Sequence, residues 1–252
     1  MAAALGIQLY TLREEAALDF PGVLDRLGRL GFAHVEVAGR HGLTAEETRS
    51  RVEDAGMEVA SLHGMPFGDD AARVFDEAEA LGSPRVVVPV AGPDEFKSAD
   101  AVDAVAARLN AAARSAAERG LGLAYHNHFW EWTVLPDGGA AFDRLVAGLA
   151  PEVQLEVDVY WAQTAGCDPP TLLAELGTRA SLLHLKDGPA DGPDSPMTTA
   201  GTGAVDLAAA VAAAPLDALP FVELDACAGS MWDAVEESFR YLTSRGIATA
   251  RS

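Results

Sequence analysis

Histidine and carboxylate side chains recur at the ends of short apolar segments in this chain. The set of greatest interest has two imidazoles and two carboxylates, which are Asp158, His184, Glu223 and either His126 or His128. A buried charge without a partner is costly, so carboxylates in such positions need one. Two imidazoles with two carboxylates suit a divalent ion such as Mn2+, Zn2+, Co2+ or Fe2+. The pattern predicts one divalent metal bound by these four residues.

Each chemically interesting residue also has an ordinary structural explanation. A single histidine is more often a hydrogen-bonded core or surface residue than a metal ligand. Asp158 could cap the segment that follows it, and Asp187 and Asp225 are typical loop caps. Lys186 could neutralise a neighbouring acid, and the pair 160–161 could pack at the rim of a barrel. The prediction of a metal therefore depends on the four residues together.

The elements that would hold these residues alternate along the chain. Short apolar segments of strand character are each followed by a stretch of helical periodicity. The expected strands are 6–10, 34–37, 58–62, 85–90, 121–127, 154–157, 182–185 and 221–224. The expected helices are 19–30, 44–55, 70–81, a long helix ending at 119, 139–149, 169–176, 205–213 and 231–243.

Eight repeats of strand and helix predict one closed parallel barrel. No break in composition divides the 252 residues, and a (β/α)8 TIM barrel typically needs about 250. The expected organisation is a single domain over residues 1–252. The turn after the first strand, residues 10–13, contains no glycine, so the dinucleotide-binding fingerprint is absent where a doubly wound fold would place it.

Composition narrows the expected partners and location. The net charge of −20 repels phosphate backbones, so no nucleic-acid partner is expected. The chain has only Cys167 and Cys227, which do not form a disulfide framework. No apolar run approaches a membrane span, and residues 1–9 lack the features of a signal peptide. A cytoplasmic protein without a membrane partner is expected, and a homodimer is one expected state because small barrels often pair.

Active sites of such barrels form at the carboxyl ends of the strands. Further polar and aromatic residues fall at or just after these ends and could contact a substrate. The residues predicted to bind substrate are Gln8, Tyr10, Glu36, His63 and Trp161.

Five motifs in order along the whole chain resemble the sugar phosphate isomerase/epimerase superfamily, the xylose isomerase-like barrel group. The motifs are residues 125–128 with Glu131, 158–161, 184–187, 201–206 and 222–225. The group also includes inosose dehydratases, ketose 3-epimerases, dehydroshikimate dehydratases and endonuclease IV. The resemblance implies the same barrel and a divalent metal, manganese first, held by residues of the fifth to eighth strands.

Carried over by strand register, the superfamily's usual ligands Glu, Asp, His and Glu fall on His126, Asp158, His184 and Glu223. The first position departs from the epimerases, because this chain has His126 where they have a glutamate. Glu131, one turn further along, could supply the missing carboxylate, either as a base or as a ligand in place of His126.

The implied chemistry is removal of a proton next to a carbonyl. A metal bound to a ketose carbonyl and its neighbouring hydroxyl would stabilise the enediolate. Glu223 or Glu131 would be the base, and His128 or Lys186 the acid or oxyanion partner. Reprotonation gives isomerisation or epimerisation, whereas loss of a β-hydroxyl gives dehydration.

The expected activity is therefore that of a metal-dependent isomerase or epimerase of a sugar or polyol. A dehydratase acting on a keto-sugar or keto-inositol and a non-catalytic sugar-binding barrel are the alternatives. A DNA-repair nuclease of the same fold would need a basic face, which the net charge opposes. No arginine or glycine cluster stands out near the site, so a neutral sugar or polyol fits better than a phosphate ester.

Overall fold

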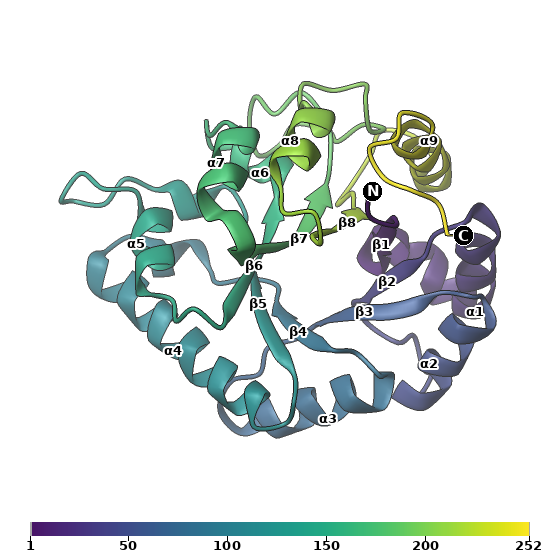
Figure 1. Cartoon of the computed structure of the whole chain (residues 1–252), viewed down its shortest axis with the longest axis horizontal. Helices are drawn as coiled ribbons and strands as arrows, with labels where there is room; N and C mark the ends of the chain where they lie inside the picture. The colour runs from purple at the N-terminus through teal and green to yellow at the C-terminus, as the bar shows by residue number, and fades with distance from the viewer. Residues whose placement is uncertain (1, 252) are drawn as a thin grey trace.

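A closed barrel of eight parallel strands forms the centre of the molecule, with helices packed around it (Figure 1). The structure, a computed structural model, describes residues 2–251. Neighbouring strands pair in chain order, and β8 closes the barrel against β1. The strands are β1 Gly6–Gln8, β2 His34–Val37, β3 Glu58–His63, β4 Arg85–Val88, β5 Gly122–His126, β6 Val153–Asp158, β7 Ala180–Leu185 and β8 Leu219–Val222. The predicted TIM barrel is confirmed.

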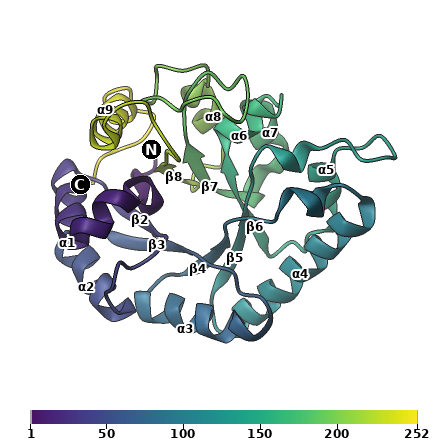
Figure 2. The same ribbon diagram turned by 180° about the vertical axis from the view of Figure 1, so that it is seen from behind.

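The α-helices follow the strands and cover the outside of the barrel, as the view from behind also shows (Figure 2). They are α1 Arg13–Leu30, α2 Ala45–Asp54, α3 Ala71–Leu81, α4 Ala99–Ala117, α5 Ala141–Gly148, α6 Val159–Thr164, α7 Pro169–Leu176, α8 Leu207–Ala213 and α9 Met231–Ser244. No helix in residues 2–251 is long and apolar enough to cross a membrane.

Alternation along the strands separates an inner from an outer core. Val86 and Val88 of β4 pack in the large cluster beneath the helices, whereas Val87 belongs to a small cluster with residues of β3, β5, β7 and β8. Successive side chains of a strand point to opposite faces. On β6, the same rule turns Leu155 and Val157 outward and Glu156 inward. Inward positions near the carboxyl ends of the strands are thus available to polar residues.

Most boundaries agree within two residues, but α1 begins at Arg13 and not at residue 19, and three other differences are informative. The first strand stops at Gln8, because the Gln8 side chain accepts a hydrogen bond from the Tyr10 backbone N–H and caps a 3-10 helix, Leu9–Leu12. The last strand lies two residues earlier than expected and ends at Val222. The short helix α6 was not predicted. Asp158 caps it by accepting from the Trp161 backbone N–H, so the capping role considered for Asp158 is confirmed.

The long segment after β7 is organised by one buried carboxylate. Asp187 accepts hydrogen bonds from the backbone N–H groups of Gly188, Gly201, Gly203 and Val205, at 2.8 to 3.1 Å. A Cβ atom at Gly203 would lie 2.2 Å from the Asp187 carboxylate, so a side chain there would displace it. The predicted structural role of Asp187 as a loop cap is confirmed.

Candidate metal centre

The four predicted metal ligands lie together at the carboxyl end of the barrel. His126 ends β5, Asp158 ends β6, His184 lies in β7 and Glu223 directly follows β8. Each offers a nitrogen or oxygen atom within 4.8 Å of the others, and all four residues are buried. We call these residues the metal group. Four neighbouring strands bring them together, although the chain separates the first from the last by almost 100 residues.

Two atoms of the metal group face each other without a hydrogen bond. His184 Nδ1 and Glu223 Oε2 lie 2.7 Å apart, yet neither makes a hydrogen bond among the described residues. His126 Nε2 lies 3.4 Å from Asp158 Oδ2. Where Nδ1 carries no proton, it is an acceptor atom that needs a cation beside it, because Lys186 pairs only with the carboxylate oxygen. The donor set of imidazole nitrogens and carboxylate oxygens fits a divalent metal.

Lys186 supplies one positive charge at the edge of the metal group. Its buried ammonium lies 2.9 Å from Asp158 Oδ2, 2.8 Å from Glu223 Oε2 and 2.7 Å from Asp225 Oδ2. The three carboxylates and this ammonium together leave two negative charges, which one divalent ion would balance. The Asp225 side chain is thus an ion-pair partner of Lys186 rather than the loop cap that the sequence suggested.

Burial and neighbouring charges act in opposite directions on these groups. Burial alone would raise the pKa of Glu223, but Lys186 and His184 outweigh it and hold that pKa well below its usual value. Burial would lower the pKa of Lys186, yet the three carboxylates raise it well above the ordinary value. Lys186 is therefore a fixed cation. Asp158 is also held in its charged form, with a lowered pKa. Deprotonated carboxylates are the form that binds a metal.

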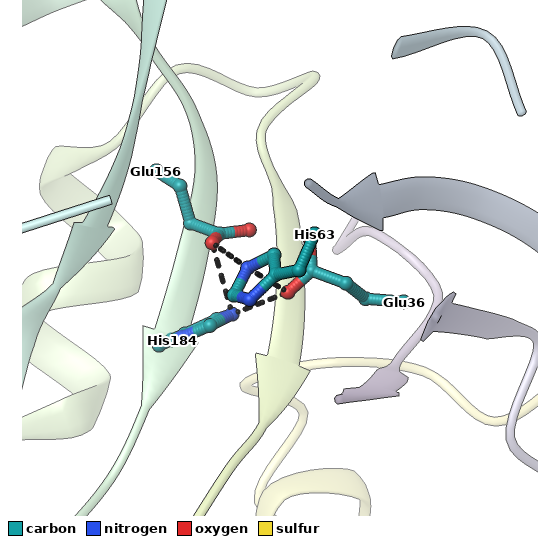
Figure 3. A group of neighbouring side chains, drawn as sticks. All are labelled: Glu36, His63, Glu156 and His184. Atoms are coloured by element: carbon teal, nitrogen blue, oxygen red, sulfur yellow. Dashed lines mark hydrogen bonds and ion pairs between the residues drawn. The ribbon is translucent and has the colours of Figure 1, made fainter. Parts of the chain in front are cut away.

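A second group of two glutamates and two histidines adjoins the metal group (Figure 3). We call Glu36, His63, Glu156 and His184 the deep group. His63 Nε2 lies 2.8 Å from both Glu36 Oε1 and Glu156 Oε2, and His184 Nε2 lies 2.9 Å and 3.3 Å from the same two oxygens. His184 thus belongs to both groups and presents a different ring nitrogen to each.

Sequence analysis missed Glu156, although the chain carried a signal for it. Glu156 and Asp158 are two residues apart on β6, so both side chains point into the barrel, with Glu156 one layer below the strand end. A carboxylate at an inward position of a barrel strand is as unusual as one at its end, because it too must be paired.

An open cavity of about 460 Å3 lies beside the metal group. Its lining residues include most of those predicted for substrate, with parts of the metal group, and are Gln8, Tyr10, Ala38, His63, Pro89, Val90, His126, His128, Glu223 and Asp225. Glu36 is fully buried and does not line the cavity, because Ser61, His63 and His184 surround its carboxylate. Its predicted contact with substrate does not fit this position.

A second cavity, of about 430 Å3, adjoins the first at His128 and Asp225. Trp161 lines it, together with residues of the segments 193–197 and 226–228. Trp161 is therefore placed to contact a group that extends beyond the first cavity.

Glu131 and His128 lie outside both groups. Glu131 is fully buried and accepts hydrogen bonds from the Tyr125 hydroxyl at 2.7 Å and the His128 backbone N–H at 3.0 Å. Burial raises its pKa to about 7. It does not line the cavity, so the structure brings His126 and not Glu131 to the metal group. Burial lowers the pKa of His128 to about 2, so its imidazole is neutral and could donate a hydrogen bond but not act as a cationic acid.

Comparison with known proteins adds a family and a set of relatives. The model of the xylose isomerase-like TIM barrel family matches residues 24–214. A 2-epi-5-epi-valiolone 7-phosphate 2-epimerase of Actinoplanes sp. is 36% identical over 136 residues, which is 53% of this chain and 47% of the relative. The match therefore spans about half the length of that curated relative.

Solved structures of low sequence identity share the fold. A sugar phosphate isomerase/epimerase from Parabacteroides distasonis matches with a TM-score of 0.84 and 23% identity, over 99% of this chain and 96% of that one. A probable 3-DHS dehydratase from Bacillus anthracis has a TM-score of 0.77 and 15% identity over 97% and 100%. The IolI protein with a bound zinc atom has a TM-score of 0.70 and 14% identity over 96% and 97%.

Proposed function

This chain belongs to the xylose isomerase-like TIM barrel family, and from that membership we propose that it is a metal-dependent isomerase or epimerase of a sugar or polyol. The observation that carries the proposal is the close approach of His184 Nδ1, which has no hydrogen bond among the described residues, to Glu223 Oε2 at 2.7 Å, with Glu223 lining an open cavity. These two residues would help to hold a divalent cation, which would supply Lewis-acid chemistry to a substrate in the cavity.

His126, Asp158, His184 and Glu223 would hold the ion, with manganese as the first candidate. The bound ion would polarise a carbonyl oxygen and stabilise negative charge on it as a neighbouring C–H bond breaks. Zinc is a second candidate, because the same fold holds zinc in the IolI protein and a set of two imidazoles and two carboxylates suits it.

Glu223 is the proposed base. It lines the cavity, and its lowered pKa keeps the carboxylate free to accept a proton. The proton on the carbon next to the carbonyl would pass to this carboxylate, and the electrons of the C–H bond would form the enediolate. Return of this proton to the neighbouring carbon would give an isomer, whereas an epimer would form when water in the open cavity protonates the opposite face. Lys186, 2.8 Å from Glu223, and the neutral His128 would stabilise the oxyanion.

A substrate without a phosphate group fits this cavity best. None of the described residues that line it is a lysine or arginine, and the nearby Lys186 already pairs with three carboxylates. A phosphate group would add negative charge beside Glu223 and Asp225. We therefore propose an uncharged sugar or polyol, although the printed name of the Actinoplanes relative refers to a phosphate ester.

Exchange of a ketose α-proton with solvent deuterium tests the proposal without knowledge of the final product. Glu223→Gln should lose about 10²–10⁴-fold in exchange rate, because the amide keeps the shape but cannot accept the proton. Glu131→Gln, a matched change of a buried glutamate away from the cavity, should lose less. An active Glu223→Gln with an inactive Glu131→Gln would reverse the two roles. Elimination of water during exchange would identify a dehydratase instead.

A further inference from the structure

The ring of His184 lies between two carboxylates, one on each nitrogen. Nε2 is 2.9 Å from Glu36 Oε1 in a hydrogen bond, whereas Nδ1 is 2.7 Å from Glu223 Oε2 without one. A neutral imidazole carries a single proton. If that proton lies on Nε2 and is donated to Glu36, the lone pair of Nδ1 points into the metal group. Metal-binding histidines commonly donate their other N–H to a carboxylate in this way.

Glu36 is itself held in place from both sides. The Ser61 hydroxyl donates to Glu36 Oε2 at 2.6 Å, and a shift in the register of β2 and β3 places Ser61 beside Glu36. His63 Nε2 lies 2.8 Å from Oε1, the same oxygen that faces His184. The side chain is fully buried, so no substrate in the cavity reaches it. The position of Oε1 is thus determined by protein contacts alone.

His63 has a proton on the nitrogen that faces the deep group. The oxygen of the Gln8 amide accepts from the Tyr10 N–H, so the amide nitrogen, 2.9 Å from His63 Nδ1, donates to it. The neutral ring then carries its proton on Nε2. An imidazolium ring would also carry a proton on Nε2. In either form Nε2 donates to the carboxylates and has no lone pair for a metal.

We propose that Glu36 is the positioning residue of the metal centre: it accepts the Nε2–H of His184 and thereby directs Nδ1 to a single metal ion. Beneath that ion, the ring nitrogens of His63 and His184 that face Glu36 and Glu156 carry protons. Glu36, His63 and Glu156 therefore bind no second metal. The proposal rests on the metal of the proposed function but not on the reaction.

Zinc titration of the full-length chain tests this role. Glu36→Gln should raise the Kd for Zn2+ by 10–100-fold, because the amide can turn its NH2 group toward His184 Nε2 and oppose the required tautomer. Glu53→Gln, the same change on the exposed face of α2, should leave the Kd unchanged. Ser61→Ala, which removes only the support of Glu36, should give a smaller increase and serves if Glu36→Gln does not fold.

Two further measurements separate positioning from general damage to the fold. Elemental analysis of the zinc-loaded wild type should give one equivalent. Its histidine 15N spectrum should show His184 with a protonated Nε2 and a metal-bound Nδ1, and this signature should change in Glu36→Gln.

An unchanged Kd in Glu36→Gln would overturn the positioning role. A second equivalent of zinc that disappears in His63→Gln would overturn the claim that Glu36, His63 and Glu156 bind no metal. A protein that binds one equivalent in the expected way but exchanges no α-proton would contradict the proposed function alone and would still support this proposal.

Discussion

The metal group and the deep group have the same composition but opposite properties. Each contains two histidines and two carboxylates, and they share His184. In the metal group, His184 Nδ1 has no hydrogen-bond partner among the described residues, and Glu223, 2.7 Å from it, lines an open cavity. In the deep group, His63 donates to Glu156 Oε2 and His184 to Glu36 Oε1, Glu36 is fully buried, and only Glu156 Oε1 lacks a hydrogen bond among the described residues of this group apart from His184 Nδ1. Residue types alone therefore do not identify a metal site. The location of the protons distinguishes the two groups.

Buried glutamates in and near these groups show the same dependence on context. Lys186 and His184 lower the pKa of Glu223 below its usual value in spite of burial. Glu131 is equally buried, but among the described residues its ion-pair contact is with His128, whose imidazole is neutral. The pKa of Glu131 therefore rises to about 7. A buried carboxylate thus stays charged only where a neighbouring cation outweighs the effect of burial.

The strongest test of this comparison removes the cation of the metal group. Lys186→Met should lower the free energy of unfolding of the metal-free protein by about 3–5 kcal/mol, because three carboxylates lose their buried partner. Mn2+ should restore part of that loss, since it replaces the missing charge. Urea denaturation with and without Mn2+ measures both effects. Lys97→Met, at an exposed pair with Asp94, should change stability by no more than about 0.5 kcal/mol. If Mn2+ does not change the stability of Lys186→Met, the assignment of the metal group as a metal site would be contradicted.

A second prediction uses the carboxylate that has no cation. Glu131 holds its proton up to a pKa of about 7 in the folded protein but loses it near its ordinary value of 4.5 when unfolded. Between these values the folded state binds more protons, so stability falls as pH rises. The shift corresponds to about 3 kcal/mol.

Glu131→Gln should remove this contribution. Urea denaturation at pH 5 and pH 8 would compare the variant with the wild type, and the wild type should lose more stability between the two pH values. Equal pH dependence of both proteins would show that Glu131 is charged in the folded state.

The smallest expected effect is a difference in zinc affinity between variants of two carboxylates on β6. Asp158→Asn should raise the Kd for Zn2+ at least about tenfold more than Glu156→Gln does, because the first removes a ligand charge and the second a neighbour of the ligand His184. Asn also preserves the cap of α6, since its side-chain oxygen can still accept from Trp161. Calorimetric titration of both variants gives the ratio. A greater loss in Glu156→Gln would place the metal in the deep group.

Much of the barrel followed from local patterns in the chain. The β2 strand and helix α7 match their predicted ranges, and the capping box of Thr44 and Glu47 begins α2 as expected. The differences arise where a side chain ends an element through a contact of its own. Gln8 shortens β1 by accepting from Tyr10, and Asp158 starts a short helix that has too few residues to show a period.

The sequence by itself determined the order of strands and helices, the closed barrel, and the polar residues that gather at one end of it. It did so because hydrophobic periodicity and parallel strand connections leave few other arrangements. It also placed His126, Asp158, His184 and Glu223 at the ends of neighbouring strands. Each of these conclusions needs only residue types and their spacing along the chain.

Only the tertiary structure decided what each polar residue faces. It brought Glu156 beneath Asp158, turned the two nitrogens of His184 toward different carboxylates, and buried Glu36 and Glu131 away from the cavity. Hydrogen bonds such as that from Ser61 to Glu36 join residues of different strands. Their geometry depends on strand register and barrel closure. The hydrophobic period of a single segment contains no information about either. Proton positions follow from such contacts, and so the distinction between a metal ligand and its support appears only in the folded chain.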